Sequence, residues 1–99
     1  MPRKRVDVEK GLLNKGFRGR EGDHHYYNYF NTQGKKTAVF TKTSHSHIEI
    51  STGLISLMAK QCKVPKQTFE QLVDCPLSQL QYEGLLIEGG HVSPLSPVI

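Results

Sequence analysis

The aromatic segment at residues 24–30 restricts this chain to a fold that contains a β-sheet. The segment reads His-His-Tyr-Tyr-Asn-Tyr-Phe and holds three of the four tyrosines. Aromatic residues in so short a run favour a strand over a helix. Gly22 before it and the turn signal at residues 31–34 after it set its bounds. Alternation then places two sets of side chains on opposite faces: His24, Tyr26, Asn28 and Phe30 on one, and His25, Tyr27 and Tyr29 on the other.

The second set is the more uniformly aromatic, so we expect it to face the core, with His24 and Asn28 toward solvent. A second strand, antiparallel to the first, is predicted at Lys35–Thr43, where Thr and Val alternate with Ala, Phe and Lys. Its threonines and lysines are typical of a half-exposed strand. Residues 18–23 are expected to supply a further strand, which completes a three-stranded antiparallel sheet.

A helix is predicted before these strands. Val8, Leu12 and Leu13 recur at helical spacing. Asp7 suits the N-cap of this helix, and Gly16 suits the position that follows its last turn. The N-terminal helix is therefore expected to end just before the sheet begins.

Further helices are predicted after the strands. Ser51 or Thr52 begins one that runs to Cys62, Pro65 begins a second, and residues 78–87 form a third. The apolar stripe of the first consists of Leu54, Ile55, Met58, Ala59 and Cys62. The order of helix, strands and helices predicts an α+β fold with an antiparallel sheet packed on helices.

Length and composition predict one globular domain over residues 1–99, since 36% of the residues are hydrophobic and 22% are charged. No apolar run approaches the roughly 20 residues that span a membrane, and no apolar signal core follows the basic residues 1–5. Cys62 and Cys75 form no Cys-x-x-Cys pair, so we expect a cytoplasmic chain with reduced thiols; a single disulfide is the alternative. Residues 1–5 and 91–99 are expected to be loose ends.

Positive charge is concentrated in the first half of the chain. The formal net charge is +4, and 10 of the 13 lysines and arginines lie within residues 1–42. This distribution favours a polyanionic partner such as a nucleic acid. Five cations flank the aromatic segment and are the expected RNA-binding residues: Arg18, Arg20, Lys35, Lys36 and Lys42.

His24 is the best candidate for chemistry in this basic half. Histidine titrates near neutral pH and can take or give a proton. RNA cleavage by attack of the 2′-hydroxyl needs a base for that hydroxyl, an acid for the leaving 5′-oxygen and cations for the phosphate. The cations named above would neutralise the phosphate, and the polar run Thr41–Ser44 suits its oxygens. The alternative is a pair of surface histidines, His24 and His25, beside aromatic residues.

Two other interpretations of these side chains are weaker. His45 and His47, with the first histidine pair, could bind a metal ion, but no clear cysteine or acidic ligand accompanies them. We therefore expect no metal and no cofactor. Tyr26, Tyr27 and Tyr29 could stack on unpaired bases, although we expect at least the last two to lie in the core.

At Gly22–His25, which reads Gly-Asp-His-His, the sequence resembles the HicA family of type II toxins. These are small RNA-cleaving proteins with a fold like that of the double-stranded-RNA-binding domain. The resemblance extends over residues 6–62 and includes the helix end Asn14–Phe17 and the basic turn Gly34–Lys36. The family motif is Gly-Ser-His, and Asp23 stands where the family usually has Ser.

The resemblance implies a metal-independent endoribonuclease that acts on mRNA as the toxin of a toxin–antitoxin pair. Carried over by position, His24 is the catalytic residue, and Gly22 supports the turn before it. A HicB-like antitoxin protein is the implied partner. Residues 64–90 form a helical extension that the resemblance does not cover. Three roles stay open for it: covering the sheet, self-association into a homodimer, or taking the place of a partner.

Functions of two other classes also stay open. A non-catalytic RNA-binding module of the same fold would depend on the lysines and arginines but not on His24. Asp23 and the unexplained C-terminal extension motivate that alternative, which ranks after the toxin. A protein–protein module that meets an acidic partner with its basic face is the third.

Overall fold

A computed structural model describes residues 3–20, 22, 24–44, 48–74 and 76–92, and it confirms the α+β fold class. Within those residues it has four helices and a three-stranded antiparallel sheet. The strands are β1 (Arg3–Lys4), β2 (Phe17–Arg20), β3 (His25–Phe30), β4 (Lys36–Thr43) and β5 (Glu49–Ile50). The helices are α1 (Arg5–Leu13), α2 (Thr52–Gln61), α3 (Lys66–Val73) and α4 (Gln79–Glu88).

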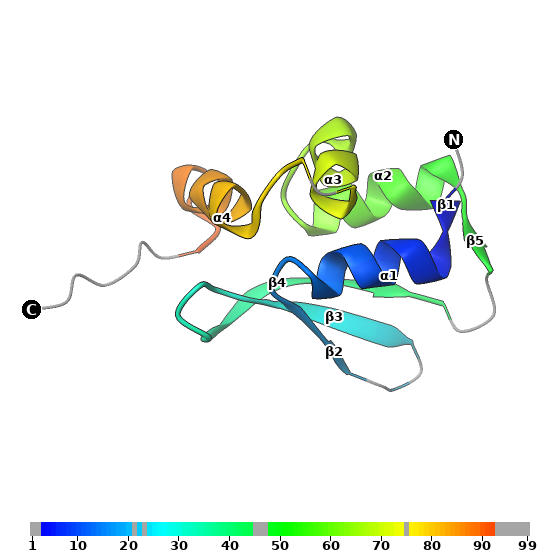
Figure 1. Ribbon diagram of the computed structural model, residues 1–99, viewed down its shortest axis with the longest axis horizontal. Helices are drawn as coiled ribbons and strands as arrows, with labels where there is room; N and C mark the ends of the chain where they lie inside the picture. The colour runs from blue at the N-terminus through cyan, green and yellow to red at the C-terminus, as the bar shows by residue number, and fades with distance from the viewer. Residues whose placement is uncertain (1–2, 21, 23, 45–47, 75, 93–99) are drawn as a thin grey trace, which may run out of the picture.

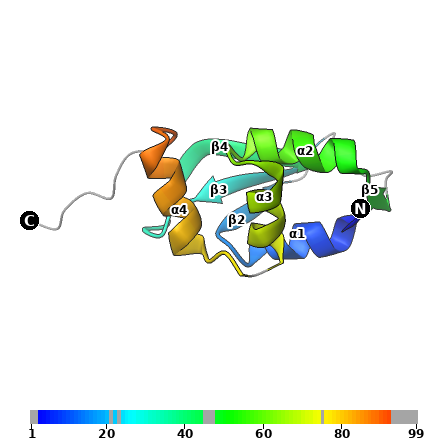
Figure 2. The same cartoon turned by 90° about the horizontal axis from the view of Figure 1, so that it is seen from above.

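The main sheet has the strand order β2–β3–β4, and both pairs are antiparallel. α1 and α2 pack on one face of this sheet, and α3 lies between those two helices (Figures 1 and 2). β1 pairs with β5 in a separate short ribbon beside the first turns of α1 and α2. Figure 1 shows no helix of the described chain on the opposite face of the main sheet.

The face of β3 that packs in the core is the one predicted from its aromatic pattern. Tyr27 and Tyr29 are buried, and His25 is half-buried on the same face. The ring of Tyr29 lies 5.2 Å from that of Phe17 and 5.1 Å from that of Tyr82, measured between centroids. Tilted and edge-on pairs of this kind stabilise by about 0.5–1.5 kcal/mol each beyond their buried area. β2, β3 and α4 therefore meet in one aromatic cluster.

The side chains that alternate with this buried set form the outer face of the sheet. The register pairs Arg18 with Asn28 and Arg20 with Tyr26. On the other side of β3, the register pairs Tyr26 with Lys42 and Asn28 with Phe40. By alternation the outer face consists of Arg18, Arg20, Tyr26, Asn28, Phe30, Lys36, Ala38, Phe40 and Lys42.

The threonines of β4 lie on the buried side of this half-exposed strand. Thr41 and Thr43 are buried. Their hydroxyls donate to Gln61 at 2.6 Å and to Glu9 at 2.6 Å. Because these partners satisfy the hydroxyls, the polar residues can face the helices at little cost. The strand is half-exposed, but its lysines and Phe40 form the exposed half.

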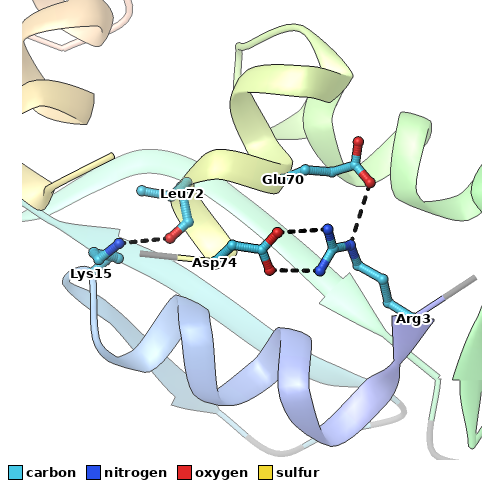
Figure 3. Close-up of polar contacts among 5 residues, drawn as sticks. All are labelled: Arg3, Lys15, Glu70, Leu72 and Asp74. Atoms are coloured by element: carbon cyan, nitrogen blue, oxygen red, sulfur yellow. Dashed lines mark hydrogen bonds and ion pairs between the residues drawn. The ribbon is translucent and has the colours of Figure 1, made fainter. Parts of the chain in front are cut away.

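Arg3 and Lys4 are not the loose lead that we expected. They form β1, and the Arg3 guanidinium donates to both carboxylate oxygens of Asp74 at 2.6 and 2.7 Å and to Glu70 at 3.4 Å (Figure 3). The hydrogen bond to Asp74 raises the pKa of Arg3 above its ordinary value. A two-point bond of this kind fixes the planar guanidinium, so the N-terminal strand is held against α3.

α1 begins three residues earlier than the sequence predicts, because β1 leads directly into it. Lys4 occupies the N-cap, and Asp7 lies in the first turn, where a carboxylate suits the positive end of the helix dipole. The helix ends at its C-cap, Asn14. Gly16 has φ of +94°, a conformation that favours glycine, as expected for the chain reversal after a helix.

Lys15 joins the end of α1 to the C-terminal helices. Its side chain is buried, and Nζ donates to the carbonyl oxygens of Leu72 at 2.7 Å and Leu77 at 2.6 Å. Figure 3 shows the first of these contacts beside the Arg3–Asp74 pair. α3 is thus fastened to both ends of α1.

The helices after the sheet begin close to the predicted residues. The Ser51 hydroxyl caps α2 by accepting from the backbone of Leu54 at 3.2 Å. Pro65 precedes α3, and Ser78 forms a capping box with Gln81 at the start of α4. Apolar side chains from the 64–90 extension lie in the same core as the sheet: Val64, Phe69, Leu72, Val73, Tyr82 and Leu86. Of the roles left open for the extension, this packing favours covering the sheet.

A buried carboxylate attaches α4 to the sheet, and the sequence patterns did not reveal it. Glu83 is 1% exposed. It accepts three hydrogen bonds: from the Tyr29 hydroxyl at 2.7 Å, from the Thr32 backbone at 2.8 Å and from the Thr32 hydroxyl at 2.9 Å. Burial, and next the hydrogen bond to Glu83, raise the pKa of Tyr29 above its ordinary value.

Close packing of α1 on α3 predicts that Gly11→Ala destabilises the protein. A Cβ at position 11 would lie 2.6 Å from the Val73 carbonyl oxygen, so two backbones would have to separate. Such overpacking costs about 1–3 kcal/mol, more than the ~1 kcal/mol that alanine contributes through helix propensity. Gly84→Ala is the matched control, because a Cβ there would meet nothing within 4 Å. We expect thermal unfolding to shift down for Gly11→Ala and up for Gly84→Ala; equal shifts would contradict the packing.

Candidate functional site

His24 lies immediately before β3, one residue outside the strand expected to contain it. It is half-buried rather than turned wholly to solvent, and its Nδ1 atom is buried. Its ring meets the ring of Tyr26 edge-on, with centroids 6.1 Å apart. A Cβ at Gly22 would lie 3.3 Å from the Tyr26 ring, so a side chain there would press on this pair. Asp23 lies outside the described residues.

A cavity of about 270 Å³ opens beside His24. It lies between the start of β3, the end of β4 and the exposed side of α2. Its polar wall consists of Arg5, His24, Lys42, Thr43, Ser44 and Gln61. Its apolar wall consists of Ile50, Leu54, Leu57 and Met58. A histidine, an ammonium and a guanidinium group therefore border one hollow, which is slightly smaller than the roughly 300–1,000 Å³ of ordinary ligand sites.

The polar wall is held by contacts to α1. Arg5 Nη1 pairs with Glu9 at 3.3 Å, and Glu9 also accepts from the Thr43 hydroxyl at 2.6 Å. Through Glu9 the first turn of α1 is linked to the end of β4, and Arg5 and Thr43 at the two ends of this link line the cavity. The carboxylate partly offsets the charge of Arg5, so Lys42, which is exposed, is the cation best placed to meet an incoming anion.

The five expected RNA-binding cations do not gather at one point. Only Lys42 borders the cavity of His24. Arg20 lies in the same row of the sheet as Lys42, with Tyr26 of the central strand between them. Arg18 and Lys36 lie farther along the outer face, near Phe30, and Lys35 is exposed in the turn before β4. Four of the five cations, Arg18, Arg20, Lys36 and Lys42, thus form a basic track across the outer face that ends at the cavity.

Sequence analysis identified part of the cavity and missed the rest. The run Thr41–Ser44 was predicted to suit phosphate oxygens because of its hydroxyl and ammonium groups. Lys42, Thr43 and Ser44 line the cavity, and Thr41 is buried elsewhere. Arg5 was assigned to a loose lead, and Gln61 was passed over at the end of an apolar helix. Gln61 did carry a signal, because a polar residue beside the buried stripe of α2 is placed to meet a polar group from the sheet.

Metal ligands do not cluster in the part of the chain that the structure describes. In that part no group of three or more His, Cys, Asp or Glu side chains is arranged to hold a metal ion. His45 and His47, the two histidines weighed for such a site, lie outside the described residues.

Cys62 is expected to be inert as a nucleophile in the folded protein. It is a free, fully buried thiol, and burial raises its pKa to about 12. At pH 8 only about one thiol in ten thousand would then be ionised, and reagents could reach it only after unfolding. Maleimide labelling followed by peptide mass spectrometry, which separates Cys62 from Cys75, should find Cys62 modified in denaturant alone. Modification of the native protein at the rate of a free thiol would contradict this burial.

Comparison of the chain with models of protein families, with curated proteins and with solved structures finds no match. Among the helices of the described residues, none is long and apolar enough to cross a membrane. The basis for assigning a function is therefore the cavity, the basic track and the short sequence motif that leads into them.

Proposed function

We propose that this protein is an RNA-cleaving toxin of the HicA type, an endoribonuclease that acts without a metal ion and uses His24 for proton transfer. One observation carries the proposal: His24 borders the same cavity as Lys42 and Arg5. A proton-transfer group beside cations is the combination that phosphodiester cleavage needs. The Gly-Asp-His-His motif at Gly22–His25 supports the same assignment.

The chemistry follows from these groups. The 2′-oxygen of a ribose attacks the neighbouring phosphorus while the bond from phosphorus to the 5′-oxygen breaks. His24 takes the proton from the 2′-hydroxyl, and water supplies a proton to the departing 5′-oxygen. The hydroxide left by that water takes the proton from His24, which restores the free base. Lys42, with Arg5 behind it, offsets the negative charge that grows on the phosphoryl oxygens. The products are a 2′,3′-cyclic phosphate and a free 5′-hydroxyl.

A non-catalytic RNA-binding module remains the second candidate, and one observation favours it. Arg18, Lys35 and Lys36 lie away from the His24 cavity, so they would bind phosphates whether or not cleavage occurs. In that case the protein would bind RNA and leave it intact. The proposed toxin would be neutralised by a HicB-like antitoxin protein. For either candidate function we also propose a cytoplasmic location and a homodimer as the oligomeric state.

Product analysis tests the cleavage proposal. Purified protein incubated with end-labelled RNA in excess EDTA should release fragments that end in a 2′,3′-cyclic phosphate. Replacing the ribose at a cleaved position by 2′-deoxyribose should abolish cleavage at that position, because the attacking group is gone. Intact RNA in EDTA, or cleavage unaffected by the deoxyribose, would overturn the proposal. Binding without cleavage would leave the second candidate.

A further inference from the structure

We propose that the outer face of the sheet binds single-stranded nucleic acid by stacking unpaired bases, and that it leads the strand to the His24 cavity. The proposal adds the substrate class, an unpaired strand, and it rests on the proposed function for its end point at His24. Its basis is the arrangement of aromatic rings and cations on the outer face.

Guanidinium groups already lie on two of the rings of this face. The Arg18 guanidinium carbon is 4.1 Å from the centroid of Phe30, and that of Arg20 is 4.6 Å from the centroid of Tyr26. A nucleobase stacks on an arginine plane as well as on an aromatic ring. Because both guanidinium groups already rest on these rings, less side-chain freedom is lost when a base joins the stack.

Phe40 supplies an uncommon feature for a sheet surface, a large apolar ring that is 44% exposed. It stands opposite Asn28, in the same row of the sheet as Arg18, and the next row contains Arg20 and Lys42. An exposed ring with cations in its own row and in the next offers a base an apolar surface and offers the neighbouring phosphates positive charge. Sequence analysis had considered only the tyrosines as a stacking platform, and two of those three are buried.

The charge of the face selects the class of partner. β2, β3 and β4 contain arginine and lysine but no aspartate or glutamate. A polyanion therefore meets no repulsion along the sheet. Bases stacked inside a duplex cannot reach rings on an open sheet, whereas unpaired bases can be splayed onto them. These two facts together favour a single strand over a duplex or an acidic protein.

The length of the outer face limits how many bases can stack on it, and one end of the face lies next to the cavity. From Tyr26 to Phe30 the strand rises roughly 13 Å, enough for two or three stacked bases. At the Tyr26 end the face is continuous with the cavity, because Lys42 pairs with Tyr26 and also borders that cavity. A strand that follows the face would thus bring its next phosphate to His24.

Binding of an oligonucleotide that the protein cannot cleave tests the platform separately from catalysis. The probes are fluorescein-labelled oligothymidylate of eight nucleotides and a duplex DNA of twelve base pairs, both without a 2′-hydroxyl. Wild type should bind the single strand more tightly than the duplex. Phe40→Ala should weaken single-strand binding by about fivefold or more, since a stacked base contributes ~1–3 kcal/mol, and should leave duplex binding unchanged. Leu80→Ala removes an exposed apolar side chain from α4 and is the matched control.

The outcomes separate this proposal from the proposed function. Single-strand binding that is unaffected by Phe40→Ala overturns the platform, even if RNA is cleaved. Phe40-dependent binding with no RNA cleavage supports the platform and overturns the nuclease. Binding of polyglutamate, but of neither oligonucleotide, would identify the face as a docking surface for an acidic protein and overturn the proposal.

Discussion

Glu83→Ala is expected to lower the free energy of unfolding by about 3 kcal/mol, because it removes the acceptor of three hydrogen bonds from a buried position. The Tyr29 hydroxyl and the Thr32 amide would lose a charged acceptor, and the aromatic cluster that joins α4 to β2 and β3 would lose its polar anchor. The loss is large because a buried donor without a partner pays its full desolvation cost.

Glu83→Gln is the matched control for that variant. The glutamine oxygen can accept from the Tyr29 hydroxyl and the Thr32 amide, and its nitrogen can donate to the Thr32 hydroxyl. We expect it to cost about 1 kcal/mol or less, because only the charge assistance is lost. Thermal unfolding followed by circular dichroism should show a fall of about 12 °C or more for alanine and a few degrees for glutamine. Equal falls would show that the hydrogen bonds do not hold α4.

Local patterns were sufficient for the three strands of the main sheet and for the helices, but not for the short strands β1 and β5. Alternation assigned Tyr27 and Tyr29 to the core, and the Ser51 cap and the Pro65 start placed two helices to within a residue or two. These signals succeed because each depends on neighbours a few positions away along the chain.

The contacts that tie the elements together could not be predicted in this way. Arg3 pairs with Asp74, 71 positions away, and Glu83 binds residues more than 50 positions before it. Nothing near Arg3 in the sequence distinguishes it from a mobile basic residue. The buried threonines of β4 show the same limit, because their partners Glu9 and Gln61 come from two different helices.

Some residues of the candidate site could be predicted from the sequence, but their arrangement around one cavity could not. His24 and Lys42 could be selected by residue type, since few side chains transfer protons or bind phosphate near neutral pH. Their common cavity depends on how β3 and β4 pair, and its remaining wall comes from Arg5 and α2. Phe40 was overlooked because a phenylalanine in a strand is ordinarily a core residue.

His24→Ala is expected to lower the rate of RNA cleavage by about 10²–10⁴-fold, the range that a positioned general acid or base contributes. Binding of RNA should change little, because Lys42 and the arginines of the outer face remain. His25→Ala is the matched control, since His25 points to the other face of β3 and does not border the cavity. Circular dichroism of each variant ensures that equal amounts of folded protein are compared.

The most direct measurement is the single-turnover rate of RNA cleavage in EDTA for wild type, His24→Ala and His25→Ala at the same folded concentration. We expect wild type and His25→Ala to cleave at similar rates and His24→Ala to be slower by at least about a hundredfold. Equal rates for all three, or cleavage by none, would contradict the assignment of His24 as the catalytic residue of a metal-independent ribonuclease.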